Sequence, residues 1–478
     1  MEPSKILRNV SISDFYGEKS VLITGATGFM GKVLVEKLLR DCGRVKCIYI
    51  LVRMKRGVDP FHRHQNYVQD IIFDRVREVA PKQLDKIRLI SGDISQESLD
   101  IDREDQEELV SNLNIIFHCA AKAKFSLTLR EALIFNTVGT LRVLQLAEKC
   151  KKLLVLSHIS TSYCCPNEKV FGERYHPAPE DPYAVIKLLK SPHENDLDEA
   201  EPRLMKGFPN TYALSKILAE GLLHSYRDKF PIVITRPSIV IAAWQEPYPG
   251  WVESKRNGLV GILLSRGRGA LRTIYSDPKK LLEAIPVDIA TNAILALTCK
   301  RAQMTGNGIL YSNLTNSGFQ KWTLGQYFDY ELEMVAKYPL DLLLWWPYCP
   351  LTTNWFYYQY RRIFYHYIPA YFVDMLCRLV GEKALLVTVQ RKFDKGMTTL
   401  GFYNTRDFVW KNDALRDLPN EMSEEDQKTF FCDYKTIDMK LCLANNVRGT
   451  RKYIIKLTDE DSLEFRKGLM RLCRQTTC

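Results

Sequence analysis

The chain has 478 residues, more than one compact hydrophobic core usually holds, so we expect two or three domains. Its net charge of +11 suits phosphate-bearing ligands, an anionic membrane surface or nucleic acid, but without zinc-finger spacing, an RNA-binding aromatic motif or a basic repeat we expect no nucleic acid partner. The 13 scattered cysteines lack the paired C-x-x-C sets of a zinc site, and the N-terminal stretch has no apolar signal core, so we expect no metal site and no signal peptide in a protein that faces the reducing cytosol.

Short apolar runs alternate with helical patterns over the first 300 residues. The strand candidates are nearly continuous apolar runs, as strands covered on both faces should be: "SVLITG", "KCIYILVR", "KIRLISGD", "NIIFHCA", "KLLVLSHIS" and "FPIVITRPS". Amphipathic stretches such as "MGKVLVEKLLRD" and "NTVGTLRVLQLAEKC" lie between them. This alternation predicts an α/β fold with a doubly wound parallel Rossmann sheet and right-handed crossovers.

The first predicted strand runs into a glycine-rich turn and then a helix, in "VLITGATGFMGKVLVEKLL". Gly25 permits the tight turn, Gly28 lets the backbone approach a pyrophosphate, and Gly31 allows the helix to pack close to the sheet. The helix N-terminus supplies N–H groups and a partial positive charge for that pyrophosphate. The T-G-x-x-G-x-x-G spacing is the variant found in short-chain dehydrogenases, so a bound dinucleotide is favoured over a glycine turn without a ligand.

Residues at the ends of the next strands indicate which dinucleotide is bound. An NAD site would place Asp or Glu after the second strand to bind the ribose 2′-hydroxyl, whereas this chain has Arg53, with Lys55 or Arg56 nearby. These cations would favour a 2′-phosphate, so NADPH is the predicted cofactor, and the alternative is that they are ordinary loop charges. Asp93 ends the third strand, where its carboxylate could accept a hydrogen bond from the adenine amino group. We expect His118, after the fourth strand, to be a core histidine rather than a catalytic one.

The stretch "TYALSK" places Tyr212 and Lys216 four residues apart, on one face of a predicted helix. A lysine ammonium beside the phenol would lower the pKa of Tyr212, which could then protonate an oxygen that receives a hydride. Lys216 could also bind the nicotinamide ribose, and Thr161 or Ser160 would hold the reacting oxygen. The alternative is an ordinary pair on a helix surface. The predicted cofactor contacts are Thr24, Gly25, Thr27, Gly28, Phe29, Met30, Gly31, Arg53, Asp93, Ile94, Tyr212, Lys216 and Pro237.

The strand–helix alternation stops after about residue 300. We therefore predict a Rossmann domain with substrate-binding elements over 1–300 and a mainly helical domain over 301–478, which includes the hydrophobic segment 338–381. Residues 342–360 carry no charge, but Pro347 and Pro350 would break a helix. This pattern favours an aromatic segment that rests on a bilayer or lines an acyl tunnel, with plain core packing as the alternative, over a transmembrane span.

Several of these motifs occur in an order that resembles the alcohol-forming fatty acyl-CoA reductase family of extended short-chain dehydrogenases. The resemblance covers nearly the whole chain and includes "ISTSY", "TYALSKILAE", "ITRPSIV", "EPYPGWVES", "GRGALRTI" and "IPVD" in the first part and "IPAYFVD", "FFCDYKTID" and "GTRKYIIKL" in the second. The chain departs from the family at Ser162, Ser215 and Met439, where relatives commonly have Ala, Thr and Trp. Its tail after "KYIIKL" is short and charged, unlike the hydrophobic tail of many relatives.

The resemblance implies that a long-chain acyl-CoA is reduced by two NADPH to a fatty alcohol. It also implies association with a membrane, on the cytosolic face of the endoplasmic reticulum or peroxisome, and leaves a homo-oligomer open. Coenzyme A carries phosphates, so a basic mouth is expected, for which Arg266, Arg268 and Arg272 with Lys255 and Arg256 are candidates. A solvated basic loop is the alternative reading of these five residues.

Other functions fit parts of the same pattern. Reduction could stop at the aldehyde, or the chain could be another extended short-chain dehydrogenase with a sterol or sugar substrate. A non-catalytic, nucleotide-sensing lipid-binding protein is a further alternative, against which the intact Tyr212 and Lys216 argue.

Overall fold

The computed structural model describes residues 7–53, 60–124, 126–193, 195–253, 258–319, 321–341 and 343–457. The chain forms two compact units: unit 1 comprises Met1–Val240, Ala284–Ser317 and Val409–Thr436, and unit 2 comprises Ile241–Glu283, Gly318–Phe408 and Ile437–Cys478. This division differs from the predicted boundary at residue 300, because helix α12 (Val287–Gln303) continues across that position and the next strand joins the sheet of unit 1. The assignment of 1–300 and 301–478 to separate domains stays a prediction.

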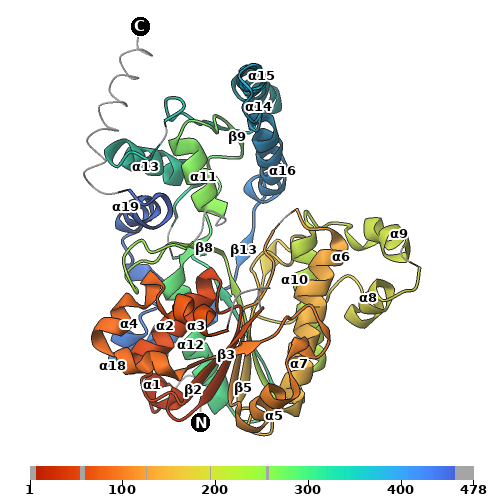
Figure 1. Ribbon diagram of the computed structural model, residues 1–478, viewed down its shortest axis with the longest axis vertical. Coiled ribbons are helices and arrows are strands. Elements are labelled where there is room, and N and C mark those ends of the chain that lie inside the picture. The colour runs from red at the N-terminus through yellow and green to blue at the C-terminus, as the bar shows by residue number, and fades with distance from the viewer. Residues whose placement is uncertain are drawn as a thin grey trace. The chain divides into compact units, whose positions relative to one another are not determined.

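Unit 1 is built on a seven-stranded sheet in which every neighbouring pair of strands is parallel (Figure 1). The order across the sheet is β11 (Gly308–Leu314), β7 (Pro231–Pro237), β5 (Val155–Ile159), β4 (Ile115–His118), β1 (Ser20–Thr24), β2 (Cys47–Val52) and β3 (Ile87–Ser91). The six predicted strands and the doubly wound parallel fold are confirmed. Strands β1, β4 and β5 are buried along their whole length, which explains their continuous apolar sequences.

Strand β11 is the one member of this sheet that the sequence pattern did not predict. Its sequence "GILYSNL" contains Gly, Ser and Asn, which are typical of turns, and its first four residues are only partly buried. It lies at the edge of the sheet, next to β7, where a strand needs no continuous apolar run.

Helices cover both faces of the sheet (Figure 1). One layer contains α1 (Ile12–Tyr16), α2 (Phe29–Asp41), α4 (Asp74–Val79), α12, α17 (Asp413–Glu421) and α18 (Glu424–Thr429). The other contains α5 (Arg103–Asn112), α6 (Leu129–Ala132), α7 (Gly139–Lys149), α8 (Pro182–Leu189), α9 (Asn195–Leu204) and α10 (Thr211–Ser225). Because parallel strands end on the same edge, this arrangement brings the predicted site residues to one edge of the sheet.

Unit 2 is mainly helical. It contains α11 (Gly258–Gly267), α13 (Leu324–Lys337), α14 (Trp355–Arg362), α15 (Ile368–Leu379), α16 (Leu386–Asn404) and α19 (Met439–Gly449). Its parallel strands β9 (Ile274–Tyr275) and β12 (Leu351–Thr352) pair with each other. Within the residues that the structure describes, every helix falls short of the length and apolarity that a membrane crossing needs.

Candidate active site

The glycine-rich turn joins β1 to α2 in a shape that requires glycine at two positions. Gly25 has a φ of +73°, and a Cβ there would lie 2.7 Å from the backbone nitrogen of Ala120. A Cβ on Gly31 would lie 2.2 Å from the carbonyl oxygen of Gly25, so this glycine lets the helix pack close. At Gly28, which precedes the first residue of α2, no side chain caps the helix. The turn therefore presents the start of a helix at the carboxyl end of the first strand.

The side chains of Thr24 and His118, at the ends of neighbouring strands, are hydrogen-bonded to each other inside the protein. The hydroxyl of Thr24 lies 2.7 Å from Nδ1 of His118, and Nε2 of His118 lies 3.1 Å from the hydroxyl of Thr140. Burial lowers the pKa of His118 to about 3, so the ring is neutral at physiological pH. The structure confirms His118 as a core histidine, and it shows that the Thr24 hydroxyl is hydrogen-bonded inside the protein.

Arg53, which is predicted to bind the 2′-phosphate, follows strand β2, and Asp93 follows the adjacent strand β3. Nε of Arg53 is 4.0 Å from Oδ2 of Asp93, and the Arg53 side chain is 63% exposed. The other carboxylate oxygen of Asp93 accepts hydrogen bonds from the backbone and side chain of Ser95. Next to it, the Ile94 carbonyl accepts a 3.0 Å hydrogen bond from Arg142. Lys55 and Arg56 lie outside the described residues.

Helix α10 brings Tyr212 and Lys216 to the end of β5. Asn210 caps the helix by accepting a hydrogen bond from the Ala213 N–H. The Lys216 ammonium donates to the carbonyl oxygen of Ile159 at 2.7 Å, and Tyr212 is hydrogen-bonded to the side chain of Thr161. These contacts bring the predicted Thr161, Tyr212 and Lys216 to one place.

The expected lowering of the Tyr212 pKa is wrong for this structure. Burial raises the pKa of Tyr212 above that of a free phenol, and the hydrogen bond with Thr161 only partly opposes this. Burial also lowers the pKa of Lys216 to about 8, with Glu220 opposing the shift. The prediction considered only the nearby ammonium, whereas burial of the phenol has the larger effect and the Lys216 ammonium donates to a backbone carbonyl. Tyr212 therefore remains protonated at neutral pH, as a proton donor must be.

The second predicted oxygen holder, Ser160, points to a different partner. Its hydroxyl donates to Oε1 of Glu220 at 2.5 Å and is buried. Glu220 in turn forms a bidentate pair with Arg236, with distances of 3.0 Å and 2.6 Å. Ser160 is thus occupied by a buried ion pair, and Thr161 is the hydroxyl that accompanies Tyr212.

Sequence reasoning missed the Glu220–Arg236 pair, although both residues stand in quoted motifs. Both side chains are fully buried, and Arg236 also donates to the carbonyl oxygens of Gly172 and Arg174. Burial disfavours the charge of Glu220, but Arg236 holds the pKa of this carboxyl below its usual value. A charged residue one helical turn after Lys216 and another in an apolar strand were the available signals.

The three arginines suggested for a coenzyme A mouth have partners within unit 2. Arg266 is buried and pairs with Glu331 at 2.7 Å, and Arg268 makes a bidentate pair with Asp341. Arg272 is also buried. Arg266 and Arg268 therefore form neither a solvated loop nor a row of unpaired cations, because acidic residues from distant parts of the sequence pair with them. Lys255 and Arg256 lie outside the described residues.

Comparison with known proteins identifies the family of this chain. A family model described as male sterility protein, of the NAD-binding type, matches residues 23–294, and a second model with that description, for the Sterile domain, matches 365–457. The chain is 35% identical to fatty acyl-CoA reductase 1 of Xenopus laevis over 93% of this chain and 86% of that protein. It is 36% identical to fatty acyl-CoA reductase 2 of Homo sapiens over 97% of this chain and 89% of that protein. The chain belongs to the fatty acyl-CoA reductase family.

Solved structures share the fold of this fatty acyl-CoA reductase family member. The terminal R domain of the myxalamid PKS-NRPS pathway matches with a TM-score of 0.59 at 17% identity, covering 91% of both chains. The reductase domain of a nonribosomal peptide synthetase from Mycobacterium tuberculosis gives the same TM-score and identity over 93% of this chain and 96% of that one. The protein is an oxidoreductase with a short-chain dehydrogenase fold and a nicotinamide cofactor.

The glycine-rich turn of this fatty acyl-CoA reductase family member has residues that fit a dinucleotide. Among described residues beyond its chain neighbours, a Cβ on Gly28 would meet only the carbonyl oxygen of Gly25, at 3.2 Å, which leaves room beside this glycine for a ligand. The start of α2 faces that space with backbone N–H groups. The turn therefore fits a pyrophosphate group.

Proposed function

We propose that this enzyme reduces a long-chain fatty acyl-CoA to a fatty alcohol and coenzyme A, in two hydride transfers through an aldehyde. The observation that carries the proposal is the Thr161–Tyr212–Lys216 group beside a dinucleotide-type turn, in a chain of this family. NADPH, when bound, supplies the hydride in both steps.

The chain's own residues would handle the oxygen and the protons. As hydride adds to the thioester carbonyl carbon, the hydroxyls of Thr161 and Tyr212 stabilise the negative oxygen. The C–S bond then breaks to give the aldehyde and the coenzyme A thiolate, which takes a proton from water. In the second step hydride adds to the aldehyde carbon and Tyr212 gives its proton to the oxygen. Lys216 holds the nicotinamide ribose and supports the phenol.

A direct assay tests the proposal. Purified protein incubated with palmitoyl-CoA and NADPH should produce hexadecanol, identified by chromatography. Accumulation of hexadecanal without alcohol would limit the reaction to the first step, and absence of both products would overturn the proposal. Association with the cytosolic face of the endoplasmic reticulum or peroxisome is part of the proposal.

Cofactor preference should follow from Arg53. Because Arg53 stands where an acidic residue would serve NAD and its side chain is largely exposed, NADPH should be used far better than NADH. The Arg53→Asp variant should narrow the gap, chiefly by raising the KM for NADPH. Steady-state rates with both cofactors measure this, and equal rates in the unmodified enzyme would contradict the assignment.

NADPH binding should depend on the charge of Lys216. The pKa of Lys216 is lowered to about 8, so the ammonium is present below this pH and is lost as the pH rises through it. Affinity for NADPH should therefore fall above about pH 8. His118 stays neutral throughout, because its pKa is about 3. Fluorescence titrations of wild type and Lys216→Ala check this: the variant should bind weakly at every pH, and a flat wild-type profile would exclude this role.

A further inference from the structure

Apolar side chains are concentrated on the surface of the helices α14, α15 and α16. We call residues 368–395, which comprise α15, its connection to α16 and the first half of α16, the hairpin. The two helices pack against each other and are joined by a short connection with Gly381 in the left-handed conformation. Leu379 and Val380, at the tip of this hairpin, are each 75% exposed. Exposed apolar area of this extent is costly in water and indicates a partner.

The distribution of these side chains around α15 indicates what kind of partner covers them. Tyr371, Phe372 and Val373 are consecutive and all exposed, and each residue of an α-helix is turned by about 100° from the one before. Together with Ile368, Met375, Leu376 and the tip residues, they span an arc of about 200° around the helix axis. A protein partner would cover one face of such a helix, whereas a bilayer interior can surround more than half of it. The arc therefore favours lipid.

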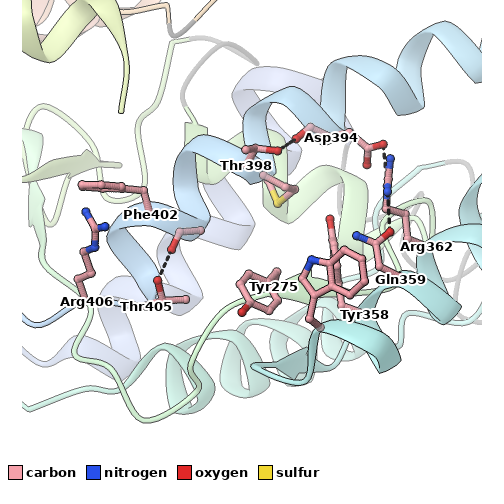
Figure 2. Close-up of a pocket in the computed structure, with 12 residues that line it drawn as sticks. Tyr275, Tyr358, Gln359, Arg362, Asp394, Thr398, Phe402, Thr405 and Arg406 are labelled. Carbon is pink, nitrogen blue, oxygen red and sulfur yellow. Dashed lines mark hydrogen bonds and ion pairs between the residues drawn. The ribbon is translucent and has the colours of Figure 1, made fainter. Parts of the chain in front are cut away.

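The opposite end of the hairpin is polar and firmly held. An open pocket at this root, between α14 and α16, is lined by Tyr358, Arg362 and Asp394 among others (Figure 2). Nε of Arg362 is 2.9 Å from Oδ2 of Asp394, which also accepts a hydrogen bond from the hydroxyl of Tyr367. Nearer the tip, Asp374 accepts hydrogen bonds from the first two N–H groups of α16. The hairpin thus has a fixed polar root and a tip at which the exposed Leu379 and Val380 lie between charged side chains.

Charge on the hairpin supports the same partner. Its exposed cations are Arg378, Lys383, Arg391, Lys392 and Lys395. Glu382 is its one exposed acidic residue, because Asp374 is buried and Asp394 is paired with Arg362. Long basic side chains can reach from an apolar surface to anionic headgroups.

We propose that the hairpin inserts its tip into the apolar layer of a bilayer that contains anionic phospholipids, with the polar root remaining at the headgroup level. This names the surface and the lipid chemistry of the membrane association included in the proposed function. It rests on that association alone and does not depend on the reductase activity.

Vesicle flotation of the full-length protein tests the proposal. The probes are vesicles of phosphatidylcholine and vesicles in which roughly a third of this lipid is replaced by phosphatidylserine. Wild type should float with both and prefer the anionic ones. The Leu379→Asp/Val380→Asp variant should bind at least about 10-fold more weakly to both, because charges replace the inserted side chains. The Lys383→Gln/Arg391→Gln/Lys392→Gln variant should lose mainly the preference for phosphatidylserine.

A matched control separates insertion from a general effect of added acid. Ile71 and Val79 are exposed apolar residues of unit 1, and Ile71→Asp/Val79→Asp should float like wild type. Equal flotation of the tip variant and wild type would overturn the proposal. So would a tip variant that changes only the oligomeric mass in sedimentation, which would assign the face to a second copy. Since flotation needs no turnover, a failure of the proposed reaction would be seen separately.

Discussion

Replacing Tyr212 by Phe should lower turnover by about 10²-fold or more while the protein stays folded and still binds NADPH. The change removes one oxygen and little volume, and it leaves the glycine turn and Arg53 untouched. The raised pKa of Tyr212 keeps the phenol protonated at neutral pH, so its proton is present before the hydride is transferred. Alcohol formation from an acyl-CoA, measured beside NADPH binding by fluorescence, checks both parts.

Lys216 provides the comparison for this variant. Lys216→Ala should reduce both turnover and cofactor affinity, since its ammonium is assigned to the ribose as well as to the phenol. The double variant should cost much less than the product of the two single effects, because the residues act as one unit. Near-normal turnover in Tyr212→Phe would mean that the pair is not catalytic.

Breaking the Glu220–Arg236 pair should cost about 3–5 kcal/mol of unfolding free energy, because it leaves a buried charge without its partner. Glu220→Gln keeps the size of the side chain but removes the charge that faces Arg236 at 2.6 Å. Denaturant unfolding measures the loss. Turnover should fall as well, because Glu220 holds Ser160, the neighbour of Thr161.

Two further variants make this expectation specific. Glu107→Gln breaks the exposed pair of Glu107 with Arg103 and should barely change the unfolding free energy. Glu220→Leu/Arg236→Met should recover much of the stability, since burying neither charge is less costly than burying one. A Glu220→Gln protein as stable as wild type would show that the pair contributes little to the fold.

The sheet could be predicted from sequence because its central strands are apolar on both faces. Continuous runs marked β1, β4, β5 and β7, whereas β11 at the edge mixes Gly, Ser and Asn with apolar residues and resembles a turn. The glycine-rich turn could also be predicted from the sequence. Gly25 and Gly31 are required by backbone geometry that is set within a few residues of the turn.

Properties set by distant partners could not be predicted in this way. Arg266 looked available for a phosphate, but it is buried and pairs with Glu331, which lies 65 residues away in the sequence. Tyr212 and Lys216 were identified as a pair from their spacing. The direction in which the pKa of Tyr212 shifts depends on how far the fold removes the phenol from water, which the spacing does not reveal. The roles of Ser160 and Thr161 could be distinguished only from the position of Glu220, which accepts a hydrogen bond from the Ser160 hydroxyl.

The stoichiometry of cofactor use distinguishes reduction to the alcohol from a reaction that stops at the aldehyde. NADPH oxidation, followed by absorbance, and release of the coenzyme A thiol, followed with a thiol reagent, can be measured in one reaction with a long-chain acyl-CoA. We expect about two NADPH oxidised per thiol released, because the thioester and then the aldehyde each receive one hydride. A ratio of one with accumulated aldehyde, or thiol release without NADPH oxidation, would contradict it.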